Sequence, residues 1–405
     1  MKYYFPTDIT EDNIGAIERQ IYFISEGIQT YKIKKENEKK YVEIVLNDDV
    51  DEYLIKQRLE EIVELEINHK NTHHNYVWYS DRICDWKYKD ILDYLLEKDI
   101  VHIHGEGQLS YKQPLIDLVE LFDNIFSNIS KIRFSADENI FPTLLKTSVL
   151  KKVGYFDSFP NLLMFTLRLK NEVNNYYNFK TEYKEIDSIE KVTSELMKYL
   201  CVTDYSLPPT MCYYVYDMLS NKEMKNHSVT TKGKSFRYEN KYCEPFKRLS
   251  DFTIRETVFL GERQYVKFCV NEYRRLATRV MDSLGIKGYC KSANDPFYLV
   301  DDYQKKIKAQ NILGAKYELR ANVNEEETIA VASFNLHGQF LAKRFNLFLD
   351  IGQKKYANTG CIGIGLERFL YSFIVQYGIE HENWPEAVRL MIKDKKKIEE
   401  FVTNL

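Results

Sequence analysis

The segment FRYENKYCEPFKRLSDFTIRETVFLG, residues 236–261, combines residue types that bind nucleotides. It carries Arg237 and Arg248, and Phe252 follows four residues after the second arginine. Guanidinium groups match phosphate oxygens in bidentate hydrogen bonds, and an aromatic face can stack on a purine. Both ends of the segment alternate in polarity, which predicts two antiparallel strands joined by a long loop. Taken alone, the segment fits a nucleotide cradle and an ordinary charged hairpin.

A second segment, TGCIGIGLERF at residues 359–369, has a cysteine near its start and an arginine near its end. Its glycines alternate with small or β-branched residues, as in a strand that other groups approach closely. The apolar residues that follow recur at helical spacing and stop at Gly378. A strand is therefore expected to lead into a helix whose first turn carries Arg368. Tight packing of this strand against this helix is an alternative explanation for the glycines.

The length, charge and composition of the whole chain limit the kinds of protein that could carry these two segments. Its 405 residues exceed the usual size of one core, so two domains are expected. With 57 basic and 60 acidic residues, the composition neither requires nor excludes a nucleic-acid partner. No apolar run approaches 18 residues and no signal-peptide pattern is present, so we expect no membrane association. Seven cysteines without paired spacing indicate a reduced, cytoplasmic protein.

The periodicity of the chain suggests three regions. Residues 1–74 are expected to form a small N-terminal α+β domain with βαββα order that ends in a polar linker. Residues 75–138 are expected to be a connecting α/β region, with a helix that starts near Pro114. Residues 139–405, which contain both segments above, are expected to form the catalytic domain.

In combination, the two segments resemble motifs 2 and 3 of class II aminoacyl-tRNA synthetases. This resemblance implies an α+β fold with an antiparallel sheet flanked by helices, ATP as a substrate, and a role for each matched residue. Arg237 would hold the α-phosphate of ATP and Glu239 would face the adenine edge. Arg248 would reach the γ-phosphate, and Phe252 would stack under the adenine. Arg368 would close over the other face of the nucleotide, so Arg237 and Arg368 are the expected catalytic residues.

Four further segments narrow the resemblance, and they are SANDPFY, AKYELR, ASFNLHGQF and VGYFDSFPNLL. Together with motifs 2 and 3 they look like the amino acid:carrier protein ligases, which are truncated relatives of the atypical, zinc-dependent seryl-tRNA synthetases. The resemblance spans roughly residues 141–378. It also implies a homodimer formed through motif 1, and VLKKVGYFDSFPNLL is expected to supply the helix, strand and proline (Pro160) of that motif.

The resemblance also implies a catalytic zinc held by Cys212, Glu256 and Cys361. Three protein ligands leave the fourth position of a zinc ion open, as catalytic sites require. In the resembled enzymes the open position takes the α-amino group of the substrate. A buried core role for Cys212 and an ordinary strand role for Glu256 are the alternatives. Magnesium is also expected, and the acidic run Glu325–Glu327 contains candidate ligands whose register the sequence leaves open.

Three residues are expected near the substrate on weaker grounds. Asn335 and His337 lie in a segment that lines the amino-acid region of the resembled family. Asp295 could shape the amino-acid pocket or begin the turn before Pro296. For His337 a structural role is the alternative to a catalytic one, and the residue types slightly favour it.

The implied reaction has two steps. A small amino acid attacks the α-phosphorus of ATP, which gives an aminoacyl-adenylate, and the acyl group then passes to an acceptor. No sustained heptad run for a tRNA-binding coiled coil appears, and the charges of the N-terminal region are balanced. The phosphopantetheine thiol of a carrier protein is therefore the expected acceptor, and tRNA is not favoured. The alternatives are a synthetase-like enzyme that acylates tRNA and a non-catalytic paralogue that acts as a binding subunit.

Overall fold

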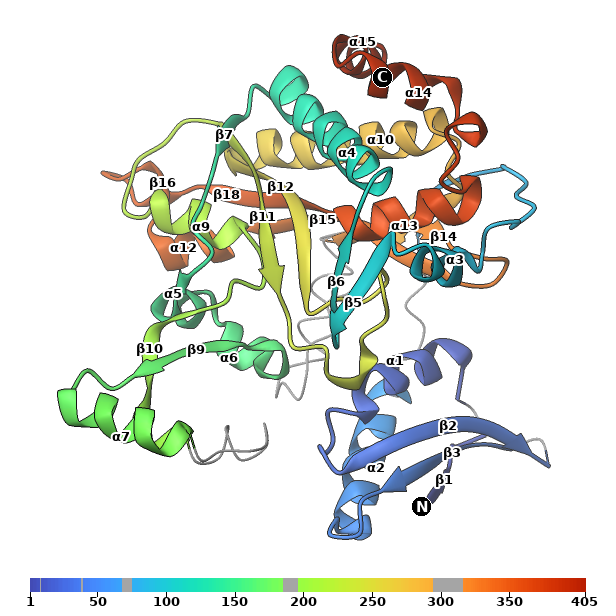
Figure 1. Cartoon of the computed structure of the whole chain (residues 1–405). Coiled ribbons are helices and arrows are strands. Elements are labelled where there is room, and N and C mark those ends of the chain that lie inside the picture. Colours follow the sequence, from blue (N-terminus) through green and yellow to red (C-terminus); the bar gives the residue numbers. More distant parts are fainter. Residues whose placement is uncertain (8, 38, 68–74, 185–195, 294–315) are drawn as a thin grey trace.

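The computed structural model describes residues 1–7, 9–37, 39–67, 75–184, 196–293 and 316–405. Figure 1 shows a small N-terminal unit beside a larger unit built on a twisted sheet. Within the described residues, no helix combines the length and the apolar character that a membrane crossing requires.

The N-terminal unit follows the predicted βαββα order. Its elements are β1 (Lys2–Tyr4), α1 (Glu11–Ile21), β2 (Ile28–Glu36), β3 (Lys39–Leu46) and α2 (Glu52–Ile67). β3 lies between β1 and β2 and is antiparallel to both. Ile17 and Ile21 of α1 are fully buried in a core that also contains Val42 and Leu59, so both helices cover one face of the small sheet. The predicted N-terminal α+β domain is thus confirmed.

The larger unit is organised by an eight-stranded sheet with the order β4-β13-β14-β15-β18-β12-β11-β7. In chain order, the strands are β4 (Tyr76–Tyr79), β7 (Asp137–Asn139), β11 (His227–Phe236), β12 (Asp251–Gly261), β13 (Gly288–Ser292), β14 (Lys316–Asn322), β15 (Thr328–Gly338) and β18 (Asn358–Gly365). Neighbouring strands are antiparallel except β7 and β11, which are parallel. β11 and β12 form the predicted hairpin, whose loop spans residues 237–250.

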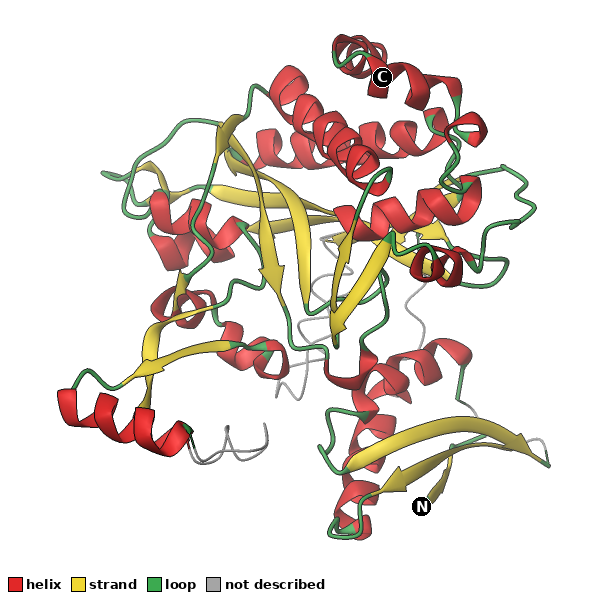
Figure 2. Cartoon of the chain, viewed as in Figure 1, coloured by secondary structure: helices red, strands yellow, loops and turns green. Residues whose placement is uncertain are grey.

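Long helices cover one face of this sheet, as Figure 2 shows. They are α4 (Leu115–Asn128), α10 (Arg263–Ser283), α13 (Leu366–Tyr377), α14 (Glu386–Lys393) and α15 (Lys396–Asn404). α10 buries Val266, Val270, Tyr273 and Ala277 at helical spacing against the sheet. α13 directly follows β18 and ends at Gly378, whose φ of +73° suits glycine, so the predicted strand-to-helix order is confirmed.

Shorter elements lie on and around the opposite face. They are α5 (Thr147–Val153), α9 (Cys212–Met218), α12 (Phe340–Phe345) and the two-stranded sheet of β16 (Phe348–Asp350) and β17 (Lys355–Tyr356). A small sheet with the order β8-β10-β9 extends from them, formed by β8 (Leu145–Lys146), β9 (Phe165–Leu169) and β10 (Leu200–Ser206), and α7 (Val173–Tyr183) lies beside it. α5, α9 and α12 share a second core with β11, β12 and β18.

Residues 75–138 contribute both outer strands of the large sheet. β4 lies at one edge and β7 at the other. Between them in the chain come α3 (Ile91–Glu97) and the hairpin of β5 (Val101–Gly105) and β6 (Gln108–Tyr111), followed by α4. The predicted boundaries at residues 74 and 138 stay predictions.

The expected motif 1 segment differs from its prediction. Residues 147–162 form α5, α6 (Tyr155–Ser158) and a 3-10 turn at Pro160–Leu162, so the expected strand is absent from this described segment. Gly154, at φ +76°, ends α5 and allows α6 to start at once. Another part of the chain has the order of helix, strand and proline that was expected for motif 1. α4 continues through a π-helical turn (Ile129–Arg133) into β7, and Pro142 comes three residues later.

Candidate active site

The sheet face opposite the long helices forms the floor of the candidate site. Glu256 of β12 and Ser333 of β15 both lie opposite Gly363 of β18, and Glu318 of β14 lies opposite Ser333. Directly opposed residues of antiparallel strands point to the same side, so the three side chains share this face. A Cβ atom at Gly363 would come within 3.0 Å of Ile254 Cδ1 and 3.6 Å of Glu256 Oε1. Glycine at this position therefore keeps the floor open beside the carboxylate.

The structure brings Cys212, Glu256 and Cys361 together over this floor, from three separate elements. Cys212 is the first residue of α9, Glu256 lies in β12 and Cys361 lies in β18. All three are buried. Thr210 Oγ1 lies 3.7 Å from Cys212 Sγ and also donates a hydrogen bond to Glu256 Oε1. His337 Nε2 lies 3.7 Å from Cys361 Sγ, on the other side of the cluster.

The three groups respond electrostatically to one another. A hydrogen bond between the two sulfur atoms raises the pKa of Cys212 and lowers that of Cys361, and burial raises the pKa of Cys212 further. Cys361 is therefore the better thiolate, and the imidazole of His337 also favours its charge. Burial, together with the negative charge at Cys361, raises the pKa of Glu256 to about 7.

This cluster fits a metal ion by its chemistry. The described part of the chain contains no group of three His, Cys, Asp or Glu side chains already arranged as a metal site. However, Oε2 of Glu256 is buried and has no hydrogen-bond partner among the described residues. Such an orphaned carboxylate oxygen beside two buried thiols is costly unless a cation compensates it. Two sulfur ligands and one oxygen ligand are a set that zinc accepts.

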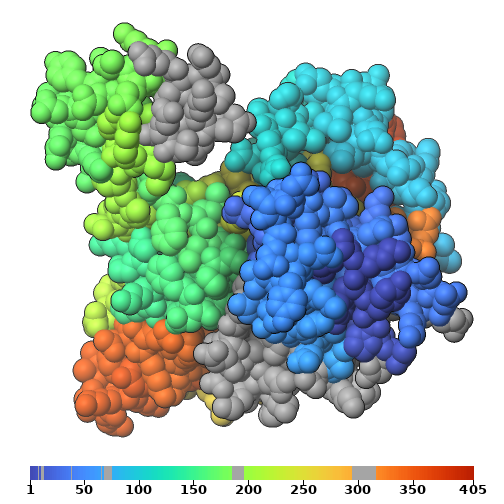
Figure 3. Space-filling model, turned by 90° about the horizontal axis from the view of Figure 1, so that it is seen from below, coloured from blue at the N-terminus to red at the C-terminus, as the bar shows by residue number. Residues whose placement is uncertain are grey.

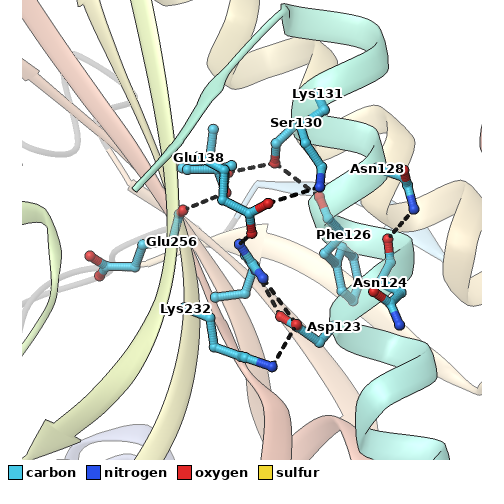
Figure 4. Close-up of polar contacts among 12 residues, drawn as sticks. Asp123, Asn124, Phe126, Asn128, Ser130, Lys131, Glu138, Lys232 and Glu256 are labelled. Carbon is cyan, nitrogen blue, oxygen red and sulfur yellow. Dashed lines mark hydrogen bonds and ion pairs between the residues drawn. The ribbon is translucent and has the colours of Figure 1, made fainter. Parts of the chain in front are cut away.

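The strand that carries Glu256 is anchored on its other face by an ion-pair network. Arg255 binds Asp123 of α4 through two hydrogen bonds of 2.7 and 2.9 Å, and its third nitrogen lies 2.9 Å from Glu138 of β7. Lys232 of β11 adds a contact of 3.0 Å to Asp123. Figure 4 shows this network on one side of β12 and the carboxylate of Glu256 on the other. Side chains alternate between the two faces of β12, so the ion pairs of Arg255 lie on one face and the candidate site with Glu256 lies on the other.

The loop between β11 and β12 holds the predicted nucleotide residues in pairs. The Arg237 guanidinium lies 5.2 Å from the centre of the Phe252 ring, and its Nε donates a 3.1 Å hydrogen bond to Pro209 O. Arg248 Nη1 donates a 3.1 Å hydrogen bond to Glu239 Oε2. These contacts place both arginines close to the end of the sheet floor. Their proposed roles toward ATP stay predictions.

Arg368, in the first turn of α13, faces the same region. Its Nε donates to Lys247 O at 2.6 Å, and its Nη1 donates to Ala330 O at 3.2 Å. Burial lowers the pKa of Arg368 to about 10, and the positive charges of Arg248 and Arg237 contribute to the shift. The guanidinium is therefore held by backbone carbonyl groups, in a region that is already rich in positive charge. Such a region attracts an anion.

Three charged residues of β14 border the site and were not predicted from the sequence. Glu318 lies on the floor, where Arg320 Nη1 donates to Glu318 Oε2 at 3.1 Å and Lys316 Nζ lies 3.7 Å from Glu318 Oε1. Burial alone would raise the pKa of Glu318, but Lys316 and Arg320 bring it below its usual value. The signal was present in KYELR, because charges at every second position of a strand share one face.

The remaining predicted residues lie in different settings. Asn335 Nδ2 is 3.7 Å from Cys361 Sγ, and His337 Nδ1 is 3.3 Å from Thr359 Oγ1, so both border the Cys–Glu–Cys cluster. Asp295 lies outside the described residues. In the acidic run 325–327, the first two residues are exposed, and Glu327 pairs with Lys247 at 2.7 Å.

Residues 199–377 match the family model described as tRNA synthetase class II core domain (G, H, P, S and T). Among curated proteins, the chain is 26% identical over 313 residues to a type-2 serine–tRNA ligase of Methanococcus aeolicus, covering 74% of this chain and 58% of that protein. It is 24% identical over 306 residues to a type-2 serine–tRNA ligase of Methanopyrus kandleri, covering 72% of this chain and 57% of that protein. The chain therefore spans less than two thirds of the length of these relatives.

Two solved structures resemble the whole arrangement. The M. kandleri SerRS, solved in complex with A. aeolicus tRNASec, superposes with a TM-score of 0.70 at 20% identity, covering 97% of this chain and 77% of that one. The cytoplasmic serine–tRNA ligase of Naegleria fowleri, in complex with AMP, gives a TM-score of 0.58 at 12% identity, covering 84% of this chain and 78% of that one. At these identities the likeness concerns the fold, and the predicted fold class is confirmed.

Proposed function

The chain carries a class II aminoacyl-tRNA synthetase core homologous to that of type-2 serine–tRNA ligases, and from this premise we propose that it activates an amino acid with ATP and transfers it to tRNA. One observation carries the proposal. Arg237 Nε donates to Pro209 O, one residue before Thr210, whose hydroxyl donates to Glu256 of the Cys212–Glu256–Cys361 cluster. Arg368 lies in the first turn of α13, which directly follows the strand of Cys361. Groups suited to phosphate therefore lie near a site suited to an amine, and this proximity supports the proposal.

The first step needs orientation and charge neutralisation rather than a protein nucleophile. The amino acid carboxylate attacks the α-phosphorus of ATP, and pyrophosphate leaves. Arg237 and Arg368 hold the reacting phosphate and stabilise the charge that develops on it. Phe252 supports the adenine from below, and Arg248 holds the γ-phosphate. Magnesium bound to the phosphates of ATP would help to neutralise their charge.

We assign the amino end of the substrate to the Cys212–Glu256–Cys361 cluster, which would hold zinc. Bound zinc would supply an open coordination position for the neutral α-amino group. The Thr210 hydroxyl holds Glu256 in place through Oε1 and leaves Oε2 free for the metal. His337 stabilises the Cys361 thiolate from the other side. This assignment is supported by the buried Glu256 Oε2, which has no hydrogen-bond partner among the described residues, and by the lowered pKa of Cys361 beside it.

The acceptor favoured by the sequence analysis is revised. The curated relatives above are serine–tRNA ligases, so the carrier-protein reading is not supported. The lack of a heptad run does not exclude tRNA as the acceptor, since 97% of this chain superposes on the M. kandleri SerRS, which was solved in complex with tRNASec. We therefore propose tRNA as the acceptor and serine as the first amino acid to test.

The test has two stages. ATP–pyrophosphate exchange is measured with each of the twenty amino acids in zinc-loaded protein, with and without a chelator. We expect exchange with one small amino acid and its loss on chelation. The enzyme is then offered tRNA and a phosphopantetheinylated carrier protein separately. Acylated tRNA supports the proposal, while acylation of the carrier alone would restore the other acceptor. No exchange with any amino acid would refute adenylation and leave the binding-subunit alternative.

A further inference from the structure

A tyrosine of the loop between β11 and β12 binds the end of α1 in the N-terminal unit, where Figure 1 shows the two side by side. The hydroxyl of Tyr242 donates to Glu18 O and accepts a 3.0 Å hydrogen bond from Tyr22 N. A continuing helix would join Tyr22 N to Glu18 O directly, so the phenolic oxygen takes the place of that bond. The rings of Tyr22 and Tyr242 also pack edge to face, with centres 4.8 Å apart. The loop thus caps the C-terminal end of α1.

Two neighbours of Tyr242 extend this contact. Asn240, at φ +51°, donates from Nδ2 to Tyr22 O at 3.0 Å, and the Lys241 ammonium donates to Ile28 O. We call the contact the seam, and it consists of Glu18, Tyr22, Ile28, Asn240, Lys241 and Tyr242. In each of these hydrogen bonds the N-terminal unit contributes a backbone group and the loop contributes a side chain. Figure 3 shows the N-terminal unit, in blue, spread over this lower face of the molecule.

A second anchor holds the same loop to the larger unit. Phe246 is fully buried, and its ring stacks on that of Tyr371 in α13, with centres 5.5 Å apart and planes 8° from parallel. Arg248 follows this anchor by two residues. The loop is therefore fixed on both units, through Phe246 on one side and through Tyr242 on the other.

The seam reaches the guanidinium of Arg248 through two contacts. The guanidinium lies over the Tyr242 ring, 5.5 Å from its centre, and Nη1 donates to Glu239 Oε2 at 3.1 Å. Glu239 directly precedes Asn240 of the seam. Both groups that contact the guanidinium thus belong to the stretch 239–242, which the seam holds against α1. The Tyr242 side chain joins the two units, because its hydroxyl binds α1 while its face contacts Arg248.

We propose that Tyr242 is a positioning residue of the nucleotide site, through which the N-terminal unit orients Arg248 toward the terminal phosphates of ATP. The inference rests on the proposed function, because the role of Arg248 at the γ-phosphate belongs to that proposal. A loop released from α1 would let the guanidinium sample more orientations, and a pre-oriented guanidinium loses less entropy when it binds a phosphate. The N-terminal unit then contributes to ATP binding before any acceptor arrives.

The test measures the dissociation constants of Mg-ATP and AMP by calorimetry on the full-length, zinc-loaded chain. Tyr242→Phe removes the hydroxyl that binds α1 and keeps the ring beside Arg248. We expect it to weaken Mg-ATP binding about three- to tenfold. AMP binding should stay unchanged, because AMP has no γ-phosphate. In pyrophosphate exchange the KM for ATP should rise by the same factor while kcat is unchanged.

A second variant breaks the seam at another hydrogen bond. Asn240→Gly removes the donor to Tyr22 O and suits the positive φ of this position. It should likewise weaken the binding of Mg-ATP and spare that of AMP. Tyr4→Phe is the matched control, because it removes a hydroxyl that donates to Glu36 at 2.9 Å, within the N-terminal unit and outside the seam. It should bind both nucleotides like the unmodified chain. Unfolding temperatures show that each variant is folded.

Arg248→Ala shows whether the effect passes through Arg248. In that background Tyr242→Phe should cause no further loss of Mg-ATP affinity. A full, additive loss would overturn the positioning role. Unchanged Mg-ATP affinity in both Tyr242→Phe and Asn240→Gly, or equal losses for Mg-ATP and AMP, would also overturn the inference while adenylation by the unmodified chain still stands. Failure of the unmodified chain to bind Mg-ATP would refute the proposed function and this inference together.

Discussion

At the scale of single residues, the two cysteines of the candidate metal site are not equivalent. Cys361 accepts the hydrogen bond of the sulfur pair and has the His337 imidazole beside it, whereas Cys212 is the donor. We predict that Cys361→Ala loses bound zinc and lowers pyrophosphate exchange at least about 100-fold, because a ligand and its charge are removed. Metal content by mass spectrometry and exchange rates check this. Cys201→Ala, in the outlying strand β10, is the control and should retain both; zinc-loaded, active Cys361→Ala would contradict the assignment.

Glu256 gives the metal-free protein a pH-dependent stability. Its pKa rises from 4.5 unfolded to about 7 folded, so the folded state binds the extra proton between these values. The contribution of Glu256 to the free energy of unfolding is then largest below about pH 4.5, falls as the pH rises, and has dropped by about 3 kcal/mol above pH 7.

Urea denaturation of chelated protein at pH 5 and pH 8 measures this loss. Glu256→Gln has no titrating carboxyl group, so the difference between the two proteins isolates the contribution of Glu256. Equal pH dependence in both proteins would show that other groups cause it. In the unmodified chain, zinc should abolish the difference in unfolding free energy between pH 5 and pH 8 that Glu256 causes, because the metal replaces the proton on Glu256.

At the scale of elements, the network of Arg255 joins β12 to α4 and thereby holds the strand that carries Glu256. The Arg255 side chain is 3% exposed and Asp123 is 6% exposed. We predict that Arg255→Met lowers the free energy of unfolding by about 3–5 kcal/mol, since it leaves Asp123 buried without its main partner.

Lys232→Met is the matched comparison, because Lys232 contacts the same Asp123 carboxylate from a side chain that is 46% exposed. It should cost about 1 kcal/mol or less. Adding Asp123→Leu to Arg255→Met should recover much of the loss, since no buried charge then remains unpaired. Equal costs for the two single variants in urea denaturation would refute the buried-charge explanation.

The helices and strands that depend on a pattern of neighbouring residues could be predicted from the sequence. The β11–β12 hairpin and the β18–α13 transition follow from local alternation, helical spacing and Gly378. The resemblance to family motifs, rather than any local pattern, selected Cys212, Glu256 and Cys361, which the fold brings together. The motif 1 strand was misplaced because Pro160 fits a 3-10 turn as well as a strand end. The contact of Tyr242 with α1 joins residues 220 positions apart, and nothing local encodes such a contact.

At the scale of the whole molecule, β7 is an edge strand of the large sheet, with no further strand paired to it among the described residues, and it lies beside exposed apolar residues. Ile140 is 93% exposed, and Ile132 and Leu144 nearby are also exposed. Exposed apolar groups at a sheet edge favour association. We propose that this edge is the homodimer interface expected for motif 1, and we predict that the protein in solution has twice the chain mass of 48.2 kDa.

Ile140→Asp should convert this dimer to a monomer, because a charge would be buried at the interface. Light scattering coupled to gel filtration measures the mass. Ile83→Asp is the control, since Ile83 is 92% exposed and follows β4 at the opposite edge of the sheet. Dissociation by both variants, or by neither, would place the interface elsewhere.

The order of strands in the large sheet also constrains how the chain is made. β4 leaves the ribosome early, yet the strand that pairs with it among the described residues is β13, which begins 212 residues after the start of β4. At cellular rates of translation this wait lasts roughly 10 to 40 seconds. During that time the backbone groups of β4 have no strand to pair with, and an unpaired strand edge favours pairing with other chains. Slowed elongation before β13 should therefore increase aggregation of newly made protein.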